Sequence, residues 1–273
     1  AKAGYSWAFG VPGIAMGIAT LIFWLGSGTF VKVPPTRELA PLDDDTRAEN
    51  RRILLRIAAV FAPIIIFWSL YDQQNTTWAQ QGGKLTPCIF WKYTLNGETM
   101  QTLNALFILL FIPLFTYVIY PWLERRNLKP SLLARMCAGM GILAVAFGAA
   151  AWLEYRIECG EKLSVLWQTG QYALLTFAEV LVSTTGLEFA FRHAPASLKS
   201  TIMSLWFLTI SFGNLLTWLI TWLNQHHDPA SGKSVAHLTG SQEMLLYIGL
   251  MICAVFAFVT VARRFEENAG SRV

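Results

Sequence analysis

The sequence predicts an all-α fold, a polytopic membrane helix bundle with seven transmembrane helices. The first observation is composition, since 54% of the 273 residues are hydrophobic and 14% are charged, whereas soluble domains carry roughly a quarter charged residues. The second is length, because seven apolar segments each reach the about 20 residues that cross a membrane as a helix. The third is that no segment alternates like a barrel strand. The spans are expected at about 7–27, 53–73, 102–122, 132–153, 165–190, 200–223 and 243–263.

Lys and Arg in the connections predict the orientation, because these residues concentrate in cytoplasmic loops. Fifteen fall in one alternate set of connections and six in the other. The pattern predicts an external N-terminus and a cytoplasmic C-terminus. The net charge of +4 is modest and gives no sign of nucleic-acid binding. Ala1 stands directly before an external span start without a signal peptide, so we expect further helices upstream.

The second span, 53–73, is apolar up to Leu70 and then turns polar in the stretch YDQQNTT. Trp68 and Asp72 are four residues apart and therefore share a helix face near the external end. Asp72 is either an interfacial acid beside an aromatic anchor or part of a functional site. Pro63 lies mid-span, where proline commonly kinks a helix.

The third span, 102–122, carries Asn104 near its external end, on the same face as Phe111. A lone Asn in a span either joins two helices by a hydrogen bond or belongs to a binding site. Pro113 is the mid-span proline here, and a second kink is expected at it. The fourth span is predicted from its apolar length alone.

The fifth span, 165–190, carries a polar stripe. Glu179 lies near its middle, and an ionisable residue inside a membrane is by default a functional hypothesis. The stripe faces either a cavity or another helix, and the plainer reading is a seam of hydrogen bonds with a protonated Glu179. At about 100° per residue, an arc of about 60° holds Tyr172, Glu179, Ser183 and Gly186, with Gln168 joining them.

Trp206 lies a few residues inside the sixth span, 200–223, with Gly213 and Thr217 on its face. An aromatic residue at that depth is either an interfacial anchor or the wall of a site. The seventh span is predicted from its apolar length.

Cysteines and histidines predict no metal site, since no CxxC or Cys/His ligand spacing occurs. Cys88 and Cys159 fall in predicted external loops, where they form either a disulfide or two free thiols; Cys137 and Cys253 are small apolar filler within spans. No nucleophile–base pair, HExxH, phosphate loop or dinucleotide fingerprint appears, so neither an enzyme nor a cofactor is predicted. The histidines are all placed in loops: His193, His226, His227 and His237.

Four stretches carry a resemblance that covers nearly the whole chain. WAFGVPGIAMGIATLIFWLG (7–26), FWSLYDQQNTTW (67–78), LNALFILLFIPLF (103–115) and AEVLVSTTGLEFAFRHAPASLKSTIMSLWFLTISFGN (178–214) are similar to the sixth, seventh, eighth and tenth–eleventh helices of one family. The sequence thus resembles the proton-dependent oligopeptide transporters (POT/PTR) of the major facilitator superfamily. The seven spans would be helices 6 to 12, the C-terminal half of that fold plus helix 6.

The resemblance implies a division of the chain. Residues 1–28 would be the helix 6 equivalent, 29–52 a cytoplasmic linker, 53–263 the C-terminal six-helix half and 264–273 a cytoplasmic tail. The linker is too short for the two extra helices of many bacterial members. Thr184 stands where the family usually has Pro after Ser183, which puts the local helix bend in question. Helices 1–5 are absent, so we expect a fragment that carries half of a site lying between two halves.

The family implies proton-coupled symport of di- and tripeptides by a multi-pass protein of the plasma (bacterial inner) membrane. Its partners would be peptides, protons, the lipid bilayer and the missing helices 1–5, with no nucleic acid. Two alternatives stay open: transport of another small solute, and a non-transporting membrane sensor. The matching positions are Glu179 and Asn104 for the peptide amine, Trp68, Trp206, Tyr172 and Ser183 around the substrate, Glu179 for proton coupling and Asp72 for the outer gate.

Overall fold

The computed structural model describes residues 5–30, 44–90, 93–227, 234–236, 238 and 240–270. The chain forms two compact units, Ala1–Asp45 and Thr46–Val273. The first unit contains α1 (Tyr5–Leu25) and the short 3-10 helix η1 (Gly26–Gly28). Nearly all of the remaining elements belong to the second unit.

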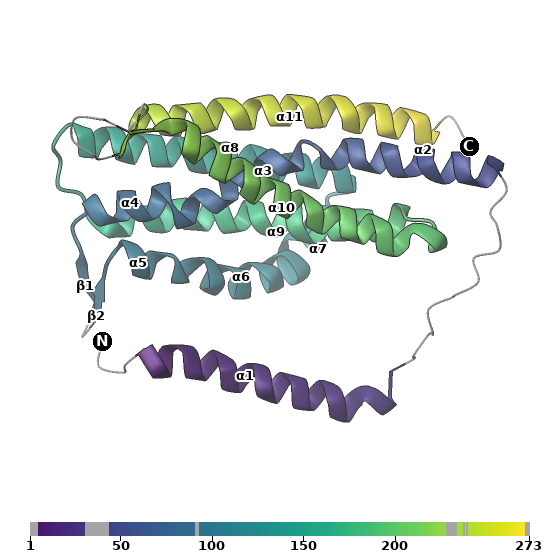
Figure 1. The fold of residues 1–273 in the computed structure, drawn as a ribbon, viewed down its shortest axis with the longest axis horizontal. Helices are drawn as coiled ribbons and strands as arrows, with labels where there is room; N and C mark the ends of the chain where they lie inside the picture. Colours follow the sequence, from purple (N-terminus) through teal and green to yellow (C-terminus); the bar gives the residue numbers. More distant parts are fainter. Residues whose placement is uncertain are drawn as a thin grey trace. The chain divides into compact units, whose positions relative to one another are not determined.

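Helices dominate the second unit, and its long helices lie side by side in Figure 1. The irregular turns are the 3-10 helices η2 (Asp72–Asn75), η4 (Val165–Trp167) and η5 (Ala196–Leu198) and the π-helical turn η3 (Phe115–Ile119). The α-helices are α2 (Asp44–Phe61), α3 (Ile64–Tyr71), α4 (Thr77–Lys84), α5 (Gly97–Met100), α6 (Thr102–Leu114), α7 (Tyr120–Arg125), α8 (Leu132–Glu158), α9 (Gln168–His193), α10 (Lys199–Asn224) and α11 (Ser241–Gly270).

The seven predicted membrane helices are confirmed. Within the described residues, seven helical stretches are long and apolar enough to cross a membrane. Two of them extend beyond the apolar spans: α2 begins at Asp44, ahead of 53, and α11 continues to Gly270, past 263. The reason is that polar helix ends project beyond the hydrocarbon, and the acidic first turn of α2 complements its dipole.

An irregularity lies at or just after each mid-span proline, where a kink was predicted. Ala62 and Pro63 form a turn between α2 and α3, because proline has no N–H to continue the hydrogen-bond ladder. Pro113 stays inside α6 but is followed at once by the π-helical turn Phe115–Ile119. A π-turn takes up an extra residue within a helix, so α6 and α7 form one interrupted membrane crossing.

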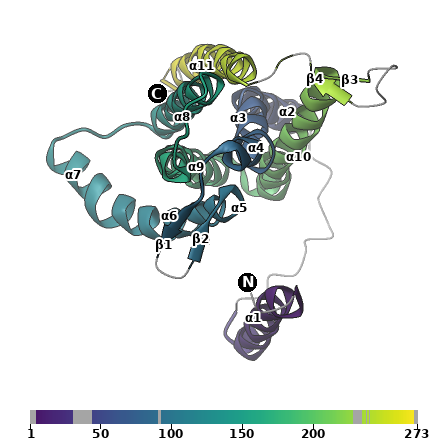
Figure 2. The ribbon, with the colours of Figure 1, turned by 90° about the vertical axis from the view of Figure 1, so that its left-hand side faces the viewer.

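Helix α9 is the packing centre of the second unit. It packs against α8 and α6, while α8 packs against α11 and α3 against α10; in the end-on view of Figure 2, α9 lies between α8 and α6. Small residues permit the close approach, since a Cβ added to Gly139 of α8 would meet Val182 and Leu181 of α9. Such contacts stabilise helix pairs in lipid, where hydrophobic burial between helices contributes little.

Two short antiparallel hairpins lie in connections that the sequence left as loops. β1 (Cys88–Phe90) pairs with β2 (Tyr93–Leu95), and β3 (Gln225–His227) pairs with β4 (Ser234–Ala236). Two histidines predicted in loops therefore belong to β3. A third, His193, is the last residue of α9, with Nδ1 3.1 Å from the carbonyl of Phe189. His237 lies outside the described residues.

Cys88 and Cys159 are both free cysteines in the structure, Cys88 half-buried and Cys159 exposed. Thr86 and Ser164 form a parallel bridge between the two loops. Cys88 comes after the bridge along its segment, whereas Cys159 comes before it along the other segment. Because the two segments run parallel at the bridge, the chain reaches the two cysteines in opposite directions from it. A disulfide needs Cα atoms within about 7 Å.

Candidate functional site

Glu179 is the centre of the candidate site, midway along α9. The side-chain amide of Asn104, in the first turn of α6, donates to Glu179 Oε2 over 2.9 Å and to Thr176 Oγ1 over 3.0 Å. The Thr176 hydroxyl donates to the backbone carbonyl of Tyr172 over 2.8 Å. The structure thus brings the two predicted polar residues, Asn104 and Glu179, into direct contact. Phe111 also faces α9, with its ring 5.6 Å from that of Phe177.

A third helix reaches the same carboxylate. Tyr71 ends α3, and its hydroxyl interacts with Glu179. Glu179 is half-buried and its neighbours are an amide, a hydroxyl and a phenol. A carboxylate in such a place can hold a proton or pair with a cationic group, because a buried charge without a partner is costly.

Two tryptophans form an aromatic wall between α3, α9 and α10. Trp206 is 1% exposed and packs edge-on against Trp68, with ring centres 6.2 Å apart, and against Phe61 at 5.3 Å. Glycines make the room, because a Cβ on Gly186 would overlap the Trp206 ring and one on Gly213 would meet Trp68. Trp206 is therefore buried between helices, which contradicts its alternative reading as an interfacial anchor, while its place at a substrate site stays a prediction.

Tyr172 occupies the α9 stripe two turns before Glu179 and is fully buried. Its ring packs edge-on against Trp78 of α4, with centres 5.5 Å apart. Its hydroxyl has no hydrogen-bond partner among the described residues. A buried hydroxyl ordinarily finds a partner, so this atom is a point where water or a ligand would add a hydrogen bond.

The last two predicted site residues lie apart from the Glu179 contacts. Ser183 is half-buried one turn further along α9, and Asp72 sits in the turn η2, where its Oδ1 accepts from Asn75 over 2.8 Å. The sequence left open whether the helix bends at Thr184, where the family usually has proline. Helix α9 continues unbroken through Thr184. The Thr184 hydroxyl donates to the Val180 carbonyl over 2.6 Å.

An ion pair between the buried Glu154 and the half-exposed Lys84 marks a second polar region. Glu154, near the end of α8, is 1% exposed. Its Oε1 accepts from Lys84 Nζ over 2.5 Å and its Oε2 accepts from Gln81 Nε2 over 2.9 Å. Gln81 Nε2 also donates to the Ala150 carbonyl over 2.9 Å. The end of α4 is thereby fixed to the end of α8.

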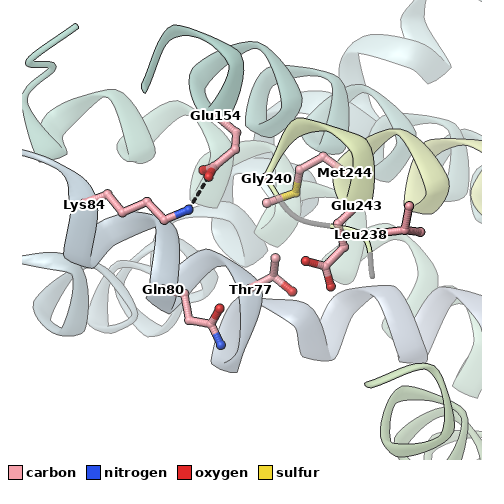
Figure 3. Close-up of a pocket in the computed structure, with 8 residues that line it drawn as sticks. All are labelled: Thr77, Gln80, Lys84, Glu154, Leu238, Gly240, Glu243 and Met244. Atoms are coloured by element: carbon pink, nitrogen blue, oxygen red, sulfur yellow. Dashed lines mark hydrogen bonds and ion pairs between the residues drawn. The ribbon is translucent and has the colours of Figure 1, made fainter. Parts of the chain in front are cut away.

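A polar pocket of about 120 Å³ lies beside this ion pair. Glu243 of α11 accepts a hydrogen bond from the Tyr247 hydroxyl over 2.7 Å, and Figure 3 shows its carboxylate turned toward Thr77. Gln168, the first residue of α9, connects the region to the α9 stripe by donating to the Trp78 carbonyl over 2.9 Å. The lining residues are Thr77, Gln80, Lys84, Glu154, Leu238, Gly240, Glu243 and Met244.

Sequence reasoning missed this polar pocket because Glu154 falls just past the predicted span 132–153 and Lys84 lies in a predicted loop. One signal was present, since Gln81 and Lys84 are three residues apart and share a helix face. In the described part of the chain no three His, Cys, Asp or Glu residues gather as a metal site.

The fold and the site together define a polytopic α-helical membrane protein with a carboxylate held between helices inside the bundle. The particular family follows from a comparison of sequences. The family model PTR2, described as the POT family, matches residues 1–43 and 41–235. The chain belongs to the POT family.

Curated relatives show the same affiliation. Solute carrier family 15 member 2 of Oryctolagus cuniculus is 31% identical over 187 residues, which cover 56% of this chain and 26% of that protein. The probable peptide transporter ptr2 of Schizosaccharomyces pombe is 28% identical over 187 residues, covering 64% of this chain and 29% of that protein. The chain thus spans about a quarter of the length of these relatives.

Solved structures share the fold. The crystal structure of an auto-inhibited POT family peptide transporter superposes with a TM-score of 0.75 at 31% identity, over 96% of this chain and 65% of that one. The POT family transporter PepTSo gives a TM-score of 0.78 at 28% identity, over 97% of this chain and 66% of that one. The all-α membrane bundle predicted from the sequence is confirmed.

Proposed function

We propose that this protein moves di- and tripeptides into the cell together with protons, by alternating access. The observation that carries the proposal is the half-buried Glu179, held at 2.9 Å by Asn104 inside a membrane bundle of the POT family. Relatives named as peptide transporters support peptides as the substrate class. Transport, without covalent chemistry, is the proposed activity.

In the proposed mechanism Glu179 is the switch. While the site is open to the acidic side, the carboxylate takes up a proton. A peptide then brings its ammonium group to Glu179 and Asn104. The aromatic wall of Trp68 and Trp206 borders the side chains of the bound peptide. Closure requires Glu179 to be protonated or paired, because closing the site around an unpaired carboxylate is costly. Asp72 is proposed as part of the outer gate.

We propose the bacterial inner membrane as the location, with the C-terminus in the cytoplasm, on the distribution of Lys and Arg among the loops. Transport is a property proposed for the whole protein, in which the helices of this chain would face helices 1–5 of the same fold across the substrate site.

The test is uptake of labelled dialanine into proteoliposomes with an acidic exterior, using the reading frame that contains this chain. We expect gradient-driven uptake in the wild type and its loss in Glu179→Gln, which keeps the size of the side chain but cannot carry the charge. Thr116→Val is the matched control, because Thr116 lies in η3 and its exposed hydroxyl donates to the Ile112 carbonyl one turn earlier.

Other outcomes separate the alternatives. Uptake that ignores the pH gradient contradicts proton coupling. If the folded protein does not take up labelled dialanine but transports another solute, and free dipeptides do not inhibit that transport, its substrate is not a peptide. Peptide binding without net flux identifies a sensor.

A further inference from the structure

Tyr71 contacts the Glu179 carboxylate from a different helix than Asn104 does. It is the last residue of α3, and its hydroxyl hydrogen-bonds with Glu179 of α9. An ionised carboxylate can only accept hydrogen bonds, so the phenol is the donor. The side-chain amides of Asn104 and Gln74 hydrogen-bond with the same hydroxyl. Glu179 therefore has two neutral donors beside it, an amide on α6 and a phenol on α3.

Neighbouring aromatic rings hold the Tyr71 side chain in this position. Its ring stacks on that of Phe67, with ring centres 6.5 Å apart and an angle of 15° between the planes. It also packs edge-on against Trp68, with ring centres 5.5 Å apart. Both neighbours are buried. Close packing on two sides leaves a side chain little freedom, so the hydroxyl is held beside the carboxylate.

One step of the proposed transport cycle needs such neutral donors, the return of the empty carrier. Once the proton and the peptide have left, Glu179 is ionised and the peptide ammonium is gone, yet the site must close again to change sides. Burying a carboxylate without a partner is costly, and hydrogen bonds to a charged group offset part of that cost. In the loaded carrier the peptide ammonium pairs with the carboxylate, so the phenol is not needed there.

We propose that Tyr71 is a positioning residue whose hydroxyl takes the place of the peptide ammonium at Glu179 while the empty carrier returns. Asn104 donates to the carboxylate over 2.9 Å, and Tyr71 adds a second donor from the other side of the site. The inference rests on the proposed function and adds to it the residue on which the return step depends.

The test compares two transport assays on the full reading frame in proteoliposomes. Net uptake of labelled dialanine, driven by an acidic exterior, requires the empty carrier to return. Counterflow does not, because unlabelled dialanine inside exchanges for labelled dialanine outside at equal pH and the carrier stays loaded. Tyr71→Phe keeps the ring and removes the hydroxyl. Its net uptake is expected to fall about ten-fold, whereas its counterflow stays within about two-fold of the wild type.

Tyr155→Phe is the matched control, since it removes a phenol hydroxyl from a side chain that is 57% exposed near the end of α8. Both of its transport rates are expected to match those of the wild type. A change in counterflow and net uptake together, in either variant, would be the mark of a damaged structure.

Thermal unfolding in detergent supplies a second measurement, which does not depend on transport. In alkaline buffer, Tyr71→Phe is expected to lower the melting temperature of the wild type more than that of Glu179→Gln. The reason is that a neutral amide accepts a weaker hydrogen bond than a carboxylate does. If Tyr71 only packs against Phe67 and Trp68, its substitution lowers both melting temperatures equally.

Three results overturn the inference: equal losses of net uptake and counterflow in Tyr71→Phe, net uptake by Tyr71→Phe at the wild-type rate, or equal falls of the melting temperature in the two backgrounds. A wild-type protein that shows neither net uptake nor counterflow contradicts the proposed function itself, and the inference falls with it.

Discussion

Gly186 shows at the scale of a single residue how closely α9 and α10 approach. A Cβ added there would overlap the Trp206 ring, whereas one added to Gly170, on the same helix, would meet nothing within 4 Å. We expect Gly186→Ala to destabilise the protein by about 1–3 kcal/mol, the usual cost of overpacking. Thermal unfolding in detergent measures the change.

Gly170→Ala is the matched control for that substitution. Alanine favours a helix over glycine by about 0.5–1 kcal/mol, so this variant is expected to be as stable as the wild type or slightly more stable. Equal destabilisation by both variants would contradict the Trp206 contact as the cause of the loss at Gly186.

The two central site residues could be predicted from the sequence because a polar group inside an apolar span stands out. Glu179 and Asn104 were each identified in this way, and the structure brings them together. Tyr71 and Thr176 could not be predicted, since a phenol at a helix end and a hydroxyl within a helix are both common. Which residues meet Glu179 depends on the rotation of α3 and α6 about their axes, and the sequence of one helix alone does not determine that rotation.

At the scale of elements, the ion pair Lys84–Glu154 fixes α4 to α8. The Glu154 side chain is 2% exposed and the Lys84 side chain 50%. We expect Lys84→Met to destabilise the protein by about 3 kcal/mol, because it leaves a buried carboxylate without its cation. Chemical or thermal unfolding in detergent is the measurement.

Arg156→Met is the control for this pair. Arg156 binds Glu161 over 2.5 Å, but both side chains are well exposed, at 38% and 40%. An exposed pair contributes under about 1 kcal/mol, so this variant is expected to unfold almost like the wild type. A Lys84→Met variant no less stable than Arg156→Met would contradict a structural role for the Lys84–Glu154 pair.

Helix number and proline breaks followed from the sequence because they depend on local chemistry: apolar length, and the missing N–H of Pro63 and Pro113. Helix ends did not. Helix α2 begins at Asp44 because a helix can extend into water once its membrane part has formed, so hydropathy marks the hydrocarbon and not the helix. The hairpins β1–β2 and β3–β4 were missed because their strands are only three residues long.

At the scale of the whole molecule, the loop charges predict which ends face the cell exterior. Cys159 is exposed at the end of α8 and falls on the predicted external side. We expect a membrane-impermeant maleimide to label it in intact cells. A cysteine introduced as Glu267→Cys, near the end of α11, in a protein that also carries Cys88→Ser and Cys159→Ser, is expected to react only after the membrane is opened. Labelling of Glu267→Cys in intact cells would reverse the proposed orientation.

The break at Pro63 has a mechanical consequence for the membrane crossing that runs from Asp44 to Lys84. That crossing consists of three stiff rods, α2, α3 and α4, joined at two short joints, the Pro63 turn and η2. Proline leaves no backbone N–H at the first joint, so a rod can tilt there without breaking a hydrogen bond from that residue. Tyr71 is the last residue of α3. A small tilt of α3 about Pro63 therefore displaces the Tyr71 hydroxyl relative to Glu179.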